Sequence, residues 1–120
     1  NPPGMAQQQP ARTATITANG VYRFNFNAFV GQRVIIEVSG TLVGGTYGAG
    51  TCSYGYISQA NAFVTEKDSA SADITATTAR RVDLIVPASG IVAVSLAGAT
   101  DPSLIATATP CLTATRVRIK

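Results

Sequence analysis

The alternation of apolar and polar side chains constrains the fold of this chain most strongly. Between Tyr22 and Asn27, every second residue is aromatic and the residues between are polar. Because successive side chains of a β-strand point to opposite faces, this pattern predicts an antiparallel strand with one face in the core and the other in water. We expect the rings of Tyr22, Phe24 and Phe26 to belong to the core rather than to a ligand-binding platform.

Short segments with the same period recur along the chain, and turn-forming residues separate them. The predicted strands cover residues 13–18, 22–27, 33–39, 54–58, 62–66, 73–78, 81–86, 91–97, 103–109 and 112–120. About ten short strands at this spacing are typical of an all-β fold. They predict an antiparallel β-sandwich that is jelly-roll-like, with a barrel as the alternative.

Four connecting features give more specific expectations. Asn19-Gly20 predicts a two-residue hairpin turn between the first two strands. Residues 40–53 are rich in glycine and predict a long surface loop, and residues 67–71 predict a polar loop. Pro110 is expected at a sheet edge or a bend, because proline has no N–H to donate to a strand ladder.

The composition supports one folded domain. The chain has 120 residues, of which 46% are hydrophobic and 12% are charged, so it can bury a core. Residues 1–11 differ, because their three prolines and three consecutive glutamines leave little apolar surface to bury. We therefore expect an extended N-terminal arm at residues 1–11 and a single β-sandwich domain at residues 12–120. The first residue is Asn1 rather than methionine, which is compatible with a trimmed precursor.

The charge pattern gives no reason to expect nucleic acid as a partner. The net charge is only +3, and closely spaced arginines occur at Arg80-Arg81 and at Arg116 and Arg118. No aromatic residues are interleaved with them, as a groove for single-stranded nucleic acid would require. No apolar run approaches the about 20 residues of a membrane-spanning helix. We therefore expect neither a specific nucleic acid nor a membrane as a partner.

The residues available for chemistry are few. The chain has no histidine and only six acidic residues. Ser-His-Asp and Cys-His catalytic arrangements are therefore excluded, and two cysteines without histidine fall short of a tetrahedral zinc site. Glu66, Asp68 and Asp73 flank a polar segment and are expected to be solvated. We predict no catalytic residue, no metal ligand and no cofactor, and we expect a protein that is not an enzyme.

The two cysteines, Cys52 and Cys111, leave two alternatives open. A disulfide between them would close a loop of about 60 residues, would stabilise the fold by about 4 kcal/mol and would indicate an oxidising compartment. Alternatively, both residues are buried thiols that pack as small apolar side chains.

Three groups of residues are candidates for partner binding. They are Pro2, Pro3, Met5, Gln7, Gln8 and Gln9 of the arm, Tyr47 and Tyr54 in or beside the glycine-rich segment, and Arg116 and Arg118 near the C-terminus. The arm would dock on a neighbouring protein, the tyrosines would stack on a sugar or a side chain, and the arginines would face an acidic partner. The alternatives are tyrosine rings that pack inward to hold the loop, and arginines that protect an edge strand from aggregation.

Several segments together resemble a known group of proteins. They are residues 21–26 (VYRFNF), 29–34 (FVGQRV), 55–58 (GYIS), 86–91 (VPASGI) and 98–100 (GAT). Their order, over roughly residues 12 to 109, resembles the small β-sandwich proteins of tailed-bacteriophage virions, such as head fibres, decoration proteins and accessory structural subunits. The resemblance implies a location in the virion, homo-oligomerisation, and docking of the arm on the capsid or on neighbouring subunits.

The same phrases are also similar to two other classes of sandwich. One is the accessory domain that follows secreted bacterial proteases, although such domains usually carry more acidic residues, often in calcium-binding loops. The other is the carbohydrate-binding module, in which exposed Trp or Tyr platforms are expected, and this chain has no Trp. The alternative function is therefore an accessory or binding module of a secreted, extracellular protein.

Overall fold

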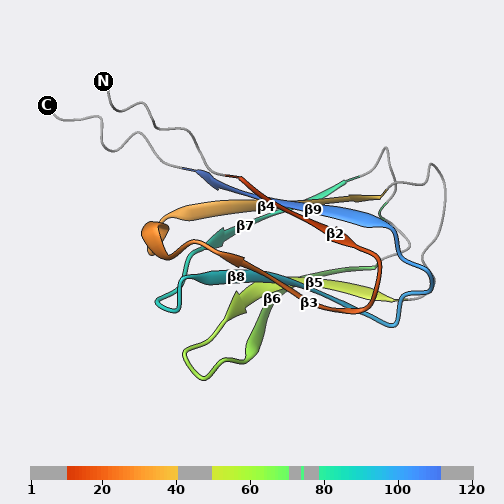
Figure 1. Ribbon diagram of the computed structural model, residues 1–120, viewed down its shortest axis with the longest axis horizontal. Helices are drawn as coiled ribbons and strands as arrows, with labels where there is room; N and C mark the ends of the chain where they lie inside the picture. Colours follow the sequence, from red (N-terminus) through yellow and green to blue (C-terminus); the bar gives the residue numbers. More distant parts are fainter. Residues whose placement is uncertain (1–10, 41–49, 71–73, 75–78, 112–120) are drawn as a thin grey trace, which may run out of the picture.

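The computed structural model describes residues 11–40, 50–70, 74 and 79–111. Within them the chain forms β2 (Arg12–Ile16), β3 (Gly20–Asn25), the short 3-10 helix η1 (Asn27–Phe29), β4 (Arg33–Gly40), β5 (Thr51–Ile57), β6 (Phe63–Ala70), β7 (Arg80–Ile85), β8 (Ile91–Ala97) and β9 (Leu104–Cys111). The strands make two four-stranded antiparallel sheets that pack face to face, as the two layers of Figure 1 show. The predicted all-β antiparallel sandwich is confirmed. No helix in the described part of the chain is long and apolar enough to cross a lipid bilayer.

The strands pair in a nested order. β2 pairs with β9, β3 with β8, β4 with β7 and β5 with β6. The first strand of the described chain therefore pairs with the last, and the second pairs with the one before the last. The β4–β9 and β5–β8 pairings then join these four pairs into sheets of order β2-β9-β4-β7 and β3-β8-β5-β6. Each sheet therefore takes strands from both halves of the chain, and neither half can complete a sheet by itself.

Alternate side chains of every sheet contribute to the core between the layers. The fully or almost fully buried residues include Phe24, Phe26, Val34, Ile36, Val38, Val92, Val94, Leu96, Leu104, Ala106 and Ala108. Tyr22 is partly buried and packs against this cluster. The predicted aromatic face of residues 22–26 is therefore a core face. Burial of each large side chain contributes about 1.5–3 kcal/mol, so the contact between the sheets is the main source of stability.

The connection at Asn19 differs from the sequence prediction. Asn19-Gly20 does not form a hairpin, because β2 and β3 lie in different sheets and each pairs with another strand. The Asn19 Nδ2 group donates a hydrogen bond to the carbonyl oxygen of Ala99 at 3.1 Å, and the Ala99 N–H donates to Asn19 Oδ1 at 3.0 Å. The side-chain amide thus ties the β2–β3 crossing to the loop between β8 and β9.

The extents of two other strands also differ from expectation. β5 begins at Thr51, inside the segment expected to be a loop, and β6 continues to Ala70 through the expected polar loop. β6 is an edge strand, and an edge strand keeps polar side chains in water without breaking its ladder to β5. Residues 41–49 and most of the strand predicted at 73–78 lie outside the described residues, as do residues 1–10 and 112–120.

Pro110 lies within β9, opposite Val34 of β4. The pairing of β9 with β2 ends at Ala108, which faces Arg12. Beyond Ala108, β9 has a paired neighbour on only one side among the described strands. This position accommodates a residue that has no N–H to donate.

Replacement of Phe24 by alanine should destabilise the protein by about 3–5 kcal/mol, because it opens a cavity between the sheets. Val21 lies on the same strand with 45% of its side chain exposed, and Val21→Ala should change stability by only about 0.5 kcal/mol. Urea unfolding followed by circular dichroism measures both values. A loss below about 1 kcal/mol for Phe24→Ala would show that this face does not form the core.

Replacement of Asn19 by alanine removes both hydrogen bonds to Ala99 and should cost about 1–2 kcal/mol, although the side chain is exposed. Thermal unfolding of the variant measures this loss. An unchanged melting temperature would mean that other contacts hold the β2–β3 connection against the loop between β8 and β9.

Candidate functional site

Among the partner-binding residues predicted from the sequence, the structure describes Tyr54. Its side chain is 0% exposed and belongs to the core cluster, so the prediction that Tyr54 contacts a sugar or a partner is wrong. The reason is that β5 begins before Tyr54, and alternation along β5 turns Cys52 and Tyr54 inward. The alternative, a ring packed into the interior, is the one that the structure has. The other candidates, Pro2, Pro3, Met5, Gln7, Gln8, Gln9, Tyr47, Arg116 and Arg118, lie outside the described residues.

Burial also determines the protonation of the two inward groups of β5. Removal from water disfavours the charged forms, and it raises the pKa of the Cys52 thiol to about 11. The same effect raises the pKa of the Tyr54 phenol well above its ordinary value. Both groups therefore stay neutral near pH 7, and neither supplies a nucleophile or a base there.

The two cysteines are free thiols in the structure. Cys52 pairs with Leu96 near the end of β8, and the chain continues from there to the start of β9 at Leu104. Cys111 lies at the opposite end of β9, as its last residue. The length of β9 separates these two ends by about 23 Å, and a disulfide needs Cα atoms within about 7 Å. The disulfide alternative is therefore not realised, and Cys52 packs as a small apolar side chain.

Three of the described acidic side chains on the sheet surfaces have partners. The Arg81 Nη2 group lies 3.1 Å from Glu37 Oε2, and the Arg33 Nη2 group lies 3.4 Å from Asp83 Oδ2. Ser53 Oγ donates to Asp68 Oδ1 at 2.7 Å. In the part of the chain that the structure describes, no group of three or more His, Cys, Asp or Glu residues is placed to hold a metal ion.

The outer face of the β2-β9-β4-β7 sheet carries a shallow depression of about 190 Å³. Strand register aligns Thr107, Glu37 and Arg81 in one row across β9, β4 and β7, and it places Thr109 beside Ile35 in the next row. These five residues line the depression. It therefore combines two hydroxyl groups, one ion pair and one aliphatic side chain on three paired strands.

The sequence predicts only two of the residues that line this depression to share one face of a strand, Ile35 and Glu37. The alternation of residues 33–39 places Ile35 and Glu37 on the face opposite Val34 and Ile36. The sequence contains no local signal that brings Thr107 and Arg81 beside Glu37, because these residues are far apart in the chain and meet only through strand register.

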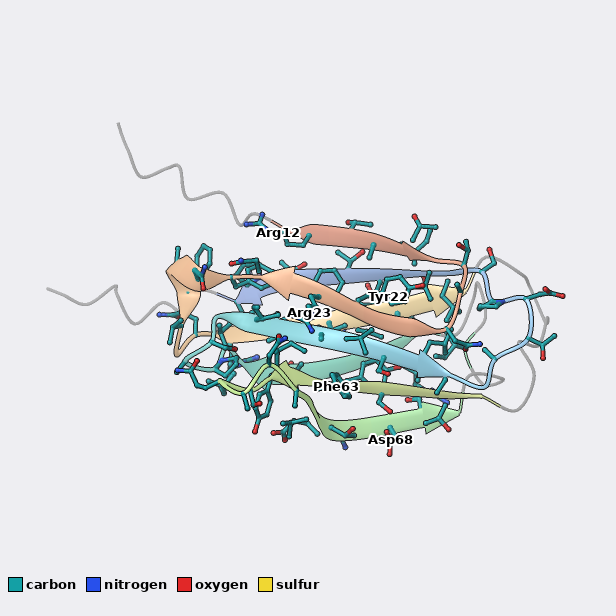
Figure 2. The ribbon with its side chains drawn as sticks, turned by 60° about the horizontal axis from the view of Figure 1, so that its bottom comes forward. Arg12, Tyr22, Arg23, Phe63 and Asp68 are labelled. Carbon is teal, nitrogen blue, oxygen red and sulfur yellow. The ribbon has the colours of Figure 1, made fainter. Side chains whose placement is uncertain are left out.

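The outer face of the β3-β8-β5-β6 sheet has a different character, and Figure 2 labels Arg23, Phe63 and Asp68 on this side of the molecule. Arg23 of β3 reaches across the sheet, and its Nη1 group donates to Asn61 Oδ1 at 2.9 Å in the turn between β5 and β6. Strand register places Ala93 of β8 beside Arg23, and Gly55 of β5 beside Ala93. Both residues are buried. The arginine thus covers a strip of sheet that has almost no side chains of its own.

The two thiols should differ sharply in reactivity. Cys111 is partly exposed, whereas Cys52 is buried and stays protonated. In the folded protein, 5,5′-dithiobis(2-nitrobenzoic acid) should react with one thiol per chain, and a second should react only after denaturation. Cys111→Ser should abolish the native reaction, and Cys52→Ser should leave it intact. Equal rates for both thiols in the folded chain would contradict the burial of Cys52.

No protein-family model matches this sequence, and no curated protein matches it either.

Proposed function

We propose that this chain is a non-enzymatic structural protein of a bacteriophage virion, which decorates or joins the particle surface through its N-terminal arm and the outer faces of its sandwich. The observation that supports this proposal most is the nested pairing of the strands, β2 with β9 through β5 with β6. We infer from it that the sandwich is a jelly roll, the eight-stranded, two-sheet architecture that viral capsid domains and lectins use. One fold hosts many functions, so the outer faces and the arm must support the virion role as well.

The outer faces suit packing against other proteins. On the β2-β9-β4-β7 sheet, charged side chains pair within the surface, Arg81 with Glu37 and Arg33 with Asp83. Aliphatic side chains lie exposed on these faces at Val21 (45%), Ile85 (56%) and Ile105 (37%), and Val30 (48%) lies exposed in the connection between η1 and β4. A neighbouring subunit that covers these side chains would gain their burial, and the pairing of the charges means that no lone charge would be buried. Homo-oligomers and complexes with other virion proteins are the assemblies that we propose.

The start of the described chain supports a role for the arm. The Arg12 guanidinium carbon lies 5.3 Å from the centroid of the Phe26 ring, and Arg12 Nε donates to the carbonyl oxygen of Asn25 at 3.4 Å. A cation–π contact and a hydrogen bond thus fix the residue from which the arm departs. A fixed point of departure limits the directions in which residues 1–11 can reach a neighbour.

A second candidate function is a binding module of a secreted protein, of the protease-accessory or carbohydrate-binding type. The polar depression on the β2-β9-β4-β7 sheet favours it, since lectins share the jelly-roll architecture. In that case the protein would be extracellular rather than part of a particle.

Quantitative mass spectrometry of density-purified phage particles from the source cells tests the proposal. The chain should be present at a constant copy number relative to the major capsid protein. Its presence only in the particle-free secreted fraction would contradict the virion role and favour the secreted module.

Light scattering coupled to size-exclusion chromatography, combined with particle binding, gives a second test. The purified chain should form a discrete oligomer or should saturate its binding to particles. Deletion of residues 1–11 should abolish particle binding while the circular dichroism spectrum of the sandwich persists. A strictly monomeric chain with no affinity for particles would contradict the proposal.

A further inference from the structure

We propose that the depression lined by Ile35, Glu37, Arg81, Thr107 and Thr109 binds a neutral sugar ring. This inference names a ligand for the binding-module alternative given above, on which it rests, and it does not depend on the virion role. It rests on the kinds of groups that the strand register brings together, on their access to solvent and on the balance of charge around them.

The lining groups match the surface of a sugar. Each hydroxyl of a sugar both donates and accepts, and the hydroxyls of Thr107 and Thr109 do the same. The Glu37 carboxylate has about four acceptor positions and the Arg81 guanidinium has five N–H donors, so the one bond between them leaves most of both sets unused. The partly buried Ile35 side chain offers an apolar surface for the C–H face of the ring.

Both charged groups can reach a ligand. The Arg81 side chain is 65% exposed and the Glu37 side chain is 43% exposed. A sugar hydroxyl can therefore bond to either group without breaking their ion pair or displacing another side chain. Adjacent strands lie about 4.8 Å apart, so Thr107, Glu37 and Arg81 present their groups in one row across three strands.

The charge balance favours a neutral ligand over an ionic one. Arg81 is neutralised by Glu37, and the neighbouring Arg33 is neutralised by Asp83. An anion bound to either guanidinium would be repelled by the carboxylate beside it, and a cation bound to either carboxylate would be repelled by the guanidinium. A neutral polyhydroxy compound uses both members of a pair and carries no such penalty.

The size and stiffness of the site set the scale of the ligand. A volume of about 190 Å³ equals roughly six water molecules at about 30 Å³ each, which suits one ring rather than a chain. β9 and β4 are the interior strands of their sheet, and threonine is stiff at its first side-chain torsion. The two threonines therefore lose little conformational entropy on binding, whereas the exposed Arg81 side chain loses more, which limits the affinity.

Nuclear magnetic resonance titration of the full-length ¹⁵N-labelled chain tests the proposal. The probes are the methyl glycosides of glucose, galactose, mannose and N-acetylglucosamine, and an array of neutral, sulfated and other acidic oligosaccharides extends the search. At least one probe should shift the amide signals of residues 35, 37, 81, 107 and 109 in a saturable way. The affinity should be the same at low and high salt, because no net charge is involved.

Thr107→Val removes one hydroxyl and keeps the branched shape, so it should weaken binding at least tenfold with an unchanged melting temperature. Thr15→Val is the matched control, since Thr15 is exposed on β2 and pairs with Ile105, which is not part of the depression. This control should bind like the unmodified chain. Equal losses in both variants would overturn the proposal.

Three further results would also overturn it. The first is the absence of shifts with every glycoside together with no hit on the array. The second is binding of sulfated or other acidic sugars alone that disappears with salt, which would indicate an anion site. The third is a set of shifts at these amides that depends on protein concentration rather than on sugar, which would make this face an interface between copies of the chain.

Discussion

The burial of inward-facing side chains between the two sheets is the interaction on which the rest of this structure depends. Because β2 pairs with β9 and β3 with β8, the two ends of the described chain must come together before either sheet is complete. Phe24 and Phe26 from the first half then pack in one cluster with Leu96 and Leu104 from the second. The inward-facing side chains therefore stabilise the fold, and the outer faces and loops are the surfaces that can bind other molecules.

Alternation of side chains let the sequence predict which residues of a strand face inward, and the core residues of β3 and β4 show this. It contains no information about which strand lies beside which. For this reason the Asn19-Gly20 turn looked like a hairpin, although the chain crosses there between sheets. The inward position of Tyr54 has a related cause, because the start of β5 at Thr51 is set by pairing with β6 and β8 rather than by a local signal.

The candidate sugar site illustrates the same limit. Glu37 could be assigned to an outer face from the sequence, but its neighbours Thr107 and Arg81 become neighbours only through register. The proposed virion role and the proposed sugar site both use the outer face of the β2-β9-β4-β7 sheet, where Arg81 pairs with Glu37. A neighbouring subunit that covered this face would therefore compete with a sugar for it.

The nested strand order is the central claim, and cross-strand nuclear Overhauser effects test it most directly. In a ¹³C,¹⁵N-labelled sample, backbone protons of residues 12–16 should show contacts to residues 104–108, with Ala14 opposite Ala106. Contacts between residues 12–16 and 20–25 in the register of a hairpin, with none to residues 104–108, would contradict the two-sheet arrangement and the functions proposed from it.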